Sequence, residues 1–436
     1  MQLTEKQPTH KEDHTLATRL TTEPVAQNIS ATERYLKIRS QTEALCAPLA
    51  VEDMGVQPME GASPPKWHLA HTSWFFETFI LKAFGADYQT FHPMFEHLFN
   101  SYYNGVGTPY PRAARGNLSR PTVAEVQAYR RHVDARMGDL LEVQGDNAEI
   151  RKRLDLGMNH EQQHQELILT DLKYNFGHNP LHPVYRSDLY RPAAGHAQEL
   201  TFSSYAAGMT SVGATEDFCF DNELPRHPVY LGAFQLADRL ITNAEYLAFI
   251  DDRGYHNVSH WLSDGWTCVG QQGWQAPLYW KLLDGSWCEY TLSGLKPLVA
   301  NAPVTHVSGF EADAFARWAG ARLPTEHEWE RAAGEHSVSV FANLLEADYL
   351  HPQPAPTGAG VKQLFGDGWE WTSSSYGPYP GYRALAGTLG KFMASQLVLR
   401  GGSCATPRDH IRHSYRNFFY PPDRWQFSCI RLARDL

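Results

Sequence analysis

Apolar residues recur at helical spacing in four long segments of the first half of the chain. Ser30 with Glu33 and Thr122 with Glu125 form S/T-x-x-E capping boxes in front of two of these segments, and Asn147 precedes another. Four long helices joined by loops predict a helix bundle. The predicted helical segments are 34–49, 66–84, 123–143 and 149–176.

The pattern changes after about Tyr190 to short strands, Gly and Pro turns and clusters of aromatic residues. Three further helices are predicted after the capping residues Thr242, Ser308 and Thr325. We therefore predict two domains, an all-α four-helix bundle and an irregular α+β domain. The expected divisions are a flexible tail at 1–27, the helical domain at 28–195 and the second domain at 196–436.

The composition excludes several classes of function. The chain has 38 basic and 48 acidic residues, a net charge of −10, and so lacks the positive excess typical of nucleic-acid binding. No apolar run approaches the roughly 20 residues of a membrane span, and the N-terminus has no apolar signal segment. The six cysteines are scattered without a CxxC motif, which favours reduced thiols in a cytoplasmic protein.

The strongest local motif is a pair of histidines, His160 and His164, four residues apart on a predicted helix. This spacing puts both imidazoles on one face, where they can chelate one ion or form a solvated pair. His71 lies at helical intervals from Trp67 and Trp74 on another bundle helix, so its ring is expected to point inward. An inward histidine can be a metal ligand or a hydrogen-bonded core residue. With the chelating pair nearby, we favour a three-histidine metal site built from two helices.

The same motif also matches H-E-x-x-H, the pattern of zinc proteases, with Glu161 as the possible base. The longer metzincin pattern is absent, because Leu167 stands where glycine is required and no third histidine follows at the right distance. A zinc hydrolase stays open as an alternative from another reaction class.

Several ordered motifs in the second half resemble the formylglycine-generating-enzyme-like (sulfatase-modifying factor) domain over about residues 200–436. They include GDGWEWTSS, LRGGSCATPRDHIRHSYRNFF and the terminal CIRLARD. Oxidase members of that superfamily carry two cysteines shortly after RGGS, whereas here Cys404 is followed by no cysteine before Cys429. We therefore expect another use of this domain than copper-dependent cysteine oxidation, or a role as a binding scaffold.

The first half resembles a DinB-like four-helix domain with an H-x3-H-x-E motif, here ending at Glu166. A DinB-like bundle fused to this second domain resembles the sulfoxide synthases of ergothioneine biosynthesis (EgtB type). The resemblance implies an iron(II) cofactor held by His71, His160 and His164, with Glu166 near these ligands. It implies a reaction that joins a thiol to C2 of the hercynine imidazole and oxidises the sulfur to a sulfoxide with O2.

The resemblance also implies substrate-binding residues. Arg112 and Arg115 match a P-R-x-x-R element that grips the carboxylate of the thiol substrate, although loop arginines can also be merely solvated. Gln163 matches the glutamine that hydrogen-bonds the hercynine imidazole. The positions that match the pocket for the trimethylammonium group are Thr372, Asn417 and Phe418.

Two departures from the family pattern bear on the substrate and the proton donor. Trp371 stands where the branch that uses γ-glutamylcysteine has a tyrosine proton donor, so Tyr102 and Tyr103 are candidates to supply that phenol. Phe419 replaces an aspartate that binds the glutamyl amine in the same branch. The lost anion favours free cysteine as the thiol, with γ-glutamylcysteine still open.

Three alternatives accompany this interpretation. One is the ovothiol-pathway synthase, which joins cysteine to C5 of histidine and usually carries a C-terminal methyltransferase domain. The others are the zinc hydrolase and a non-enzymatic binding module. The expected partners are small molecules and neither nucleic acid nor membrane, and the sequence indicates neither an oligomeric state nor a structural calcium site.

Overall fold

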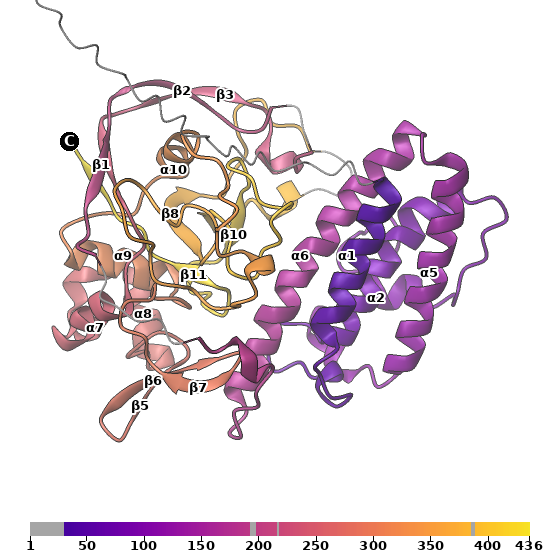
Figure 1. The fold of residues 1–436 in the computed structure, drawn as a ribbon, viewed down its shortest axis with the longest axis horizontal. Coiled ribbons are helices and arrows are strands. Elements are labelled where there is room, and N and C mark those ends of the chain that lie inside the picture. The colour runs from indigo at the N-terminus through magenta and orange to yellow at the C-terminus, as the bar shows by residue number, and fades with distance from the viewer. Residues whose placement is uncertain (1–29, 192–197, 216–217, 385–388) are drawn as a thin grey trace, which may run out of the picture.

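The computed structural model describes residues 30–191, 198–215, 218–384 and 389–436. The predicted tail 1–27 lies outside them, and the division between 195 and 196 stays a prediction for the same reason. The first half is helical and the second half consists of short strands and helices, so the two-domain fold class is confirmed (Figure 1). No helix within the described ranges is long and apolar enough to span a bilayer.

The helical domain has its helices where the sequence predicted them. Both capping boxes are formed, since Ser30 and Glu33, and likewise Thr122 and Glu125, exchange side-chain to backbone hydrogen bonds. The Asn147 side chain accepts from two backbone N–H groups at the start of the longest helix. The helices of this domain are α1 (Ala31–Cys46), α2 (Pro65–Phe76), α3 (Lys82–Phe84), α4 (Phe95–Phe99), α5 (Val123–Gln144) and α6 (Ala148–His178), with a π-helical segment Glu77–Leu81 between α2 and α3.

The second domain is built around a four-stranded sheet in the order β10-β9-β8-β11, in which β11 is parallel to β8 and the other pairs are antiparallel. Three smaller sheets have the orders β1-β4-β12, β2-β3 and β5-β6-β7. The strands are β1 (Phe202–Tyr205), β2 (Gly208–Val212), β3 (His227–Leu231), β4 (Phe234–Ala237), β5 (Trp280–Leu283), β6 (Ser286–Thr291), β7 (Gly294–Pro297), β8 (Trp369–Ser375), β9 (Leu397–Arg400), β10 (Asn417–Phe419), β11 (Ser428–Cys429) and β12 (Ala433–Asp435).

The described residues of this domain also form four α-helices: α7 (Asn243–Asp251), α8 (Ser263–Gln272), α9 (Gly309–Trp318) and α10 (Glu326–Ala333). The helices predicted after Thr242, Ser308 and Thr325 are confirmed, each with a full capping box. Helix α8 escaped prediction because its sequence, SDGWTCVGQQ, holds two glycines and its N-cap, Leu262, makes no side-chain cap.

Helix α6 lies between the rest of the bundle and the second domain (Figure 1). Glu166 on α6 accepts hydrogen bonds from Trp369 Nε1 (2.8 Å), Ser403 Oγ (2.5 Å) and Thr406 Oγ1 (2.6 Å). Gly401 and Gly402, just before Ser403, have φ values of +96° and +81°, which glycine adopts without strain. The RGGS turn thus carries a hydroxyl to the helical domain, and the hydrogen bonds of Glu166 go to the second domain rather than to a histidine of the predicted metal site.

The α2–α6 contact is close because α6 presents a glycine to two aromatic rings. A Cβ on Gly157 would lie 2.5 Å from the Phe76 ring and 2.9 Å from the Phe75 ring, both buried. Gly138 on α5 is also helical but has nothing within 4 Å of the equivalent position. The two glycines therefore form a matched pair, one tightly packed and one free.

We expect Gly157→Ala to lower the free energy of unfolding by about 1–3 kcal/mol, because the methyl group overpacks the α2–α6 contact. The control Gly138→Ala should raise it by about 0.5–1 kcal/mol, since alanine favours the helix and meets no neighbour. Urea unfolding followed by far-UV circular dichroism measures both. Equal effects of the two substitutions would contradict this packing argument.

Candidate metal centre

Three histidines converge in the core of the helical domain. His71 comes from α2, and His160 and His164 come from successive turns of α6. One ring nitrogen of each lies within 4.8 Å of the others, and the side chains are at most 8% exposed. His71 Nε2 and His160 Nε2 are 3.2 Å apart. The predicted convergence of two helices on one point is present.

The His71 ring is held between two tryptophans of its own helix. Trp67 stacks on one side at 4.5 Å between ring centroids and Trp74 on the other at 5.4 Å. His71 Nδ1 lies 2.6 Å from the carbonyl oxygen of Phe99, so Nδ1 carries the proton and Nε2 presents its lone pair to the other histidines. The helical spacing of 67, 71 and 74 produces this sandwich.

All three rings are neutral. Burial lowers the pKa of His160 to about 4, and it lowers the pKa values of His71 and His164 well below the ordinary value. Neutral imidazole is the form that binds metal ions. Three inward imidazole nitrogens fit a divalent transition metal such as iron or zinc and leave coordination positions open for other ligands.

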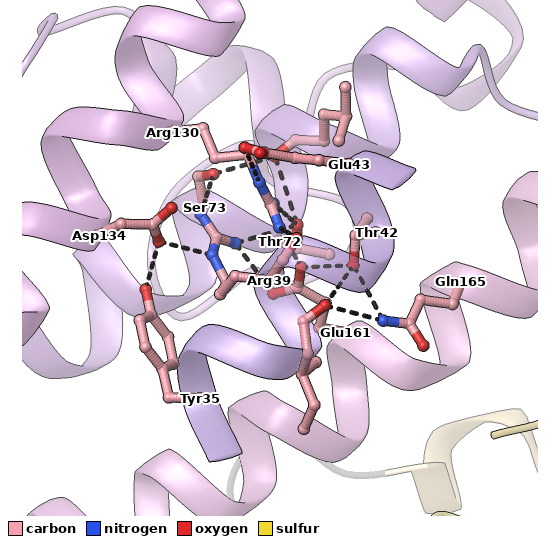
Figure 2. A network of polar contacts seen from close by, with 12 residues as sticks. Tyr35, Arg39, Thr42, Glu43, Thr72, Ser73, Arg130, Asp134, Glu161 and Gln165 are labelled. Carbon is pink, nitrogen blue, oxygen red and sulfur yellow. Dashed lines mark hydrogen bonds and ion pairs between the residues drawn. The ribbon is translucent and has the colours of Figure 1, made fainter. Parts of the chain in front are cut away.

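Glu161, the possible base of a zinc hydrolase, is held in a different part of the bundle. Its carboxylate is fully buried and pairs with Arg39 Nη1 (2.9 Å) and Arg130 Nη2 (2.5 Å), while Thr42 donates from its hydroxyl at 2.7 Å (Figure 2). Burial opposes ionisation of this carboxyl, but Arg130 and Arg39 outweigh it and lower the pKa of Glu161 to about 2. A carboxylate so bound is a poor proton acceptor, which argues against the hydrolase alternative.

Arg115 is the buried member of the predicted arginine pair. Its guanidinium lies 3.4 Å above the Trp67 ring, on the same indole that stacks with His71, and Nη1 donates to Ser63 Oγ at 2.9 Å. Its Nε has no hydrogen-bond partner among the described residues. Burial and the charge of Arg112 lower the pKa of Arg115. An anion beside this side chain would relieve both penalties.

Arg112 itself is exposed and donates to the carbonyl oxygen of Gly61. Trp425 packs over Gly61, and Phe419 meets Trp425 edge-on at 5.5 Å. Arg112 and the predicted position Phe419 are thus linked through Gly61 and Trp425. Phe419 offers only an apolar ring here.

Gln163 faces the second domain rather than the interior of the bundle. Its Nε2 donates to the Tyr415 hydroxyl at 2.7 Å, and that hydroxyl also lies 3.2 Å from His410 Nε2. This contact orients the Gln163 amide, whose carbonyl oxygen accepts no hydrogen bond within the described ranges.

The two candidate tyrosines extend from the metal centre toward the second domain. Tyr103 is buried against Trp74 at 5.4 Å and stacks on Tyr102 at 4.6 Å between ring centroids. Tyr102 in turn meets Phe392 edge-on at 5.3 Å. Burial raises the pKa of both phenols, Tyr103 the more strongly, so both stay protonated near neutral pH.

The remaining predicted residues lie on the central sheet. Phe418 is 5.8 Å from Phe392 and stacks on Tyr376 at 4.1 Å, so it continues the aromatic series that begins at Tyr103. Asn417 accepts at its side chain from the Phe418 backbone N–H. Thr372 is fully buried and donates to the Val398 carbonyl oxygen, which makes its hydroxyl a link between β8 and β9.

Sequence reasoning assigned no role to two residues behind the metal site. His68 Nδ1 lies 2.7 Å from His164 Nδ1, and His68 Nε2 lies 3.1 Å from Asp171 Oδ2. The helical spacing could have found both, because His68 precedes His71 by three residues and Asp171 follows His164 by seven, about two turns.

Comparison with known proteins agrees with this architecture. A model of the DinB superfamily matches residues 34–168, and a model of the sulfatase-modifying factor enzyme 1-like domain matches residues 192–436. The hercynine oxygenase of Mycolicibacterium thermoresistibile is 32% identical over 405 residues, which cover 86% of this chain and 88% of that protein. The hercynine oxygenase of Mycolicibacterium smegmatis is 32% identical over 403 residues, 86% of this chain and 91% of that protein. The ergothioneine biosynthesis protein 1 of Schizosaccharomyces pombe is 30% identical over 237 residues, 50% of this chain and 28% of that protein.

We expect Glu161→Gln to lower the free energy of unfolding at pH 7 by about 3–5 kcal/mol, because two buried guanidinium groups lose their anion. The pKa of Glu161 is lowered on folding, so its contribution is complete above the ordinary value of 4.5 and is lost as the pH falls toward 2. The stability difference between wild type and variant should therefore shrink over that window. Urea unfolding at a series of pH values measures it.

Glu43 provides the control, because it contacts Arg130 at 3.2 Å with a side chain that is 53% exposed. Glu43→Gln should cost at most about 1 kcal/mol. A Glu161→Gln protein as stable as wild type at pH 7 would show that these ion pairs do not stabilise the helix bundle.

Proposed function

The chain belongs to the hercynine oxygenase family, and on that premise we propose that it is an iron(II)- and O2-dependent sulfoxide synthase of ergothioneine biosynthesis. It joins the sulfur of cysteine, or of γ-glutamylcysteine, to C2 of hercynine and oxidises that sulfur. The observation that carries the proposal is the meeting of His71, His160 and His164, with Arg115 on the Trp67 ring that stacks on His71 and with its Nε unpartnered among the described residues.

The reaction balances without a further reductant. Formation of the C–S bond removes two electrons and sulfoxidation removes two more, while O2 takes up four to give the sulfoxide oxygen and one water. Iron(II), when bound by three imidazoles, supplies the O2 chemistry at its open positions. The protein itself has to bind two organic substrates, orient them and donate one proton.

Arg115 and Arg112 are proposed to bind the carboxylate of the thiol substrate. Arg115 is rigid, since the Trp67 face and the Ser63 hydroxyl fix its plane, and a fixed guanidinium binds a carboxylate with little loss of side-chain entropy. Phe419 presents no anion to a glutamyl amine, which supports cysteine as the thiol donor. The thiol would enter on the Trp67 side of His71.

Hercynine is proposed to lie between the metal centre and the second domain. The Gln163 carbonyl oxygen can accept from the hercynine imidazole N–H, because Tyr415 holds the other end of the amide. Phe418 belongs to an aromatic group with Tyr376 and Phe392, at 4.1 and 5.8 Å between ring centroids, and an aromatic surface suits a trimethylammonium group, which has no N–H to donate. Asn417 and Thr372 would shape this region through the backbone contacts of the central sheet.

We expect the iron(II)-loaded protein under air to convert hercynine and cysteine to hercynylcysteine sulfoxide, identified by its mass. His71→Ala should lose iron and lower kcat about a hundredfold or more, since even loss of a group that supports a ligand costs 10- to 100-fold. His178→Ala, an exposed histidine of α6, serves as the control.

The same assay decides among the alternatives. Histidine accepted in preference to hercynine would indicate the ovothiol reaction, and peptide hydrolysis with zinc would indicate the hydrolase. Full iron content and turnover in His71→Ala would contradict the three-histidine centre.

Tyr103 or Tyr102 is proposed to donate a proton at the reacting oxygen or sulfur. We expect Tyr103→Phe or Tyr102→Phe to change the ratio of sulfoxide to oxidised thiol by about tenfold or more, because loss of a positioned acid slows only the step that needs it. Tyr174→Phe, a half-buried tyrosine of α6 beside His178, is the control. Product ratios equal to wild type in both variants would exclude this role.

A further inference from the structure

A continuous series of hydrogen bonds runs behind the metal centre. It starts at His164, passes through His68 at 2.7 Å and reaches Asp171 at 3.1 Å. The Asp171 oxygen that meets His68 also accepts from the Ser63 backbone N–H at 2.8 Å. The Ser63 hydroxyl accepts from Arg115 Nη1 at 2.9 Å. A residue proposed to bind metal and a residue proposed to bind the thiol thus share one carboxylate.

The chemistry of the series determines which atoms donate. An ionised carboxylate only accepts, so His68 Nε2 carries the proton that faces Asp171. A neutral His68 then has a lone pair at Nδ1, and His164 Nδ1 must be the donor in that contact. His164 is left with its lone pair at Nε2. The carboxylate therefore selects the nitrogen that His164 presents to a metal ion.

The burial of these groups makes the selection strict. His68 and Asp171 are 2% and 4% exposed, and Asp171 Oδ1 has no hydrogen-bond partner among the described residues. Water therefore offers His68 no competing partner for either ring nitrogen. A reversed tautomer of His164 would place two lone pairs against each other at 2.7 Å, which is unfavourable inside the core.

The other two histidines have no such support. His71 Nδ1 donates to a backbone carbonyl group, and His160 Nδ1 is buried without a partner among the described residues. Within the described part of the chain, His164 alone of the three is connected to a charged group through a second side chain. Its basicity, and with it the strength of its bond to a metal ion, depends on the negative charge of Asp171.

We propose that His68 and Asp171 are positioning residues that hold His164 in its metal-binding tautomer and couple the metal centre to Arg115. The inference rests on the proposed function for the identity of the two ligands, iron and a thiol carboxylate. Asp171 accepts a hydrogen bond from Ser63, and Ser63 accepts one from Arg115. Loss of the Asp171 charge therefore weakens both metal binding at His164 and the positioning of Arg115. Loss of His68 weakens the metal end alone.

The test uses cobalt(II) as the metal probe, bound to the full-length protein in competition with a chromophoric chelator. Affinity, ligand-field spectrum and thermal melting are recorded for wild type, His68→Gln, Asp171→Asn, the double variant and the exposed control His178→Asn. We expect His68→Gln and Asp171→Asn to lower cobalt affinity about 10- to 100-fold with an altered spectrum. Because the two residues act in series, the double variant should bind no more weakly than His68→Gln.

The thiol end is read from the KM of cysteine in the iron(II) enzyme. Asp171→Asn should raise it severalfold, while Arg115→Gln should raise KM but leave cobalt affinity within about twofold of wild type. A purely structural role would lower the melting temperatures without this division between metal affinity and KM. If His68→Gln does not fold, the near-isosteric Asp171→Asn decides by itself.

Cobalt affinities equal to wild type in folded His68→Gln and Asp171→Asn would overturn the inference and leave the proposed function intact. Weakened cobalt binding in these two variants, together with a wild-type enzyme that makes no sulfoxide, would support the inference and overturn the proposed function. A wild-type protein that binds no cobalt at the three histidines would overturn both.

Discussion

The three imidazoles meet only if helices α2 and α6 keep a fixed rotation about their axes and a fixed shift along them. The buried ion pairs of Glu161 hold α6 in this position. Glu161 immediately follows His160 on α6 and is bound by Arg39 from α1 and Arg130 from α5. An α-helix can turn or slide only if such pairs break, and leaving charges unpaired in a core is costly. The Glu161 network and the histidine centre occupy different faces of α6, so the first can be rigid while the second stays free to bind ligands.

The second domain depends on the same helix. Glu166 receives three donors from the second domain, and Gln163 meets Tyr415 one turn away. The metal centre is therefore built within one domain but faced by groups of the other. This arrangement explains why the RGGS turn keeps its shape although the cysteine pair of the oxidases is missing, because Ser403 of that turn binds Glu166.

Local signals carried most of the prediction. Capping residues correctly marked the starts of five helices, and the i, i+4 histidines with the inward His71 correctly indicated that three imidazoles meet. Contacts between segments far apart in sequence were not accessible in this way. The sequence did not reveal the ion pairs of Glu161, because Arg39 and Arg130 lie on other helices. It did not reveal the contact of Glu166 with the second domain, because Trp369 lies 203 residues away. Helix α8 has weak propensity and forms through packing in its domain, for example of Val269.

Seven consecutive residues, His160 to Glu166, serve three separate surfaces: the histidine centre, the arginine network and the contact with the second domain. Each added residue in an α-helix turns everything beyond it by about 100°. A single insertion or deletion within this heptad would turn the residues after it away from those before it, so the three surfaces could no longer all be aligned, whereas a substitution disturbs one. Evolution of this protein can accordingly change side chains along the heptad one at a time but cannot change its length.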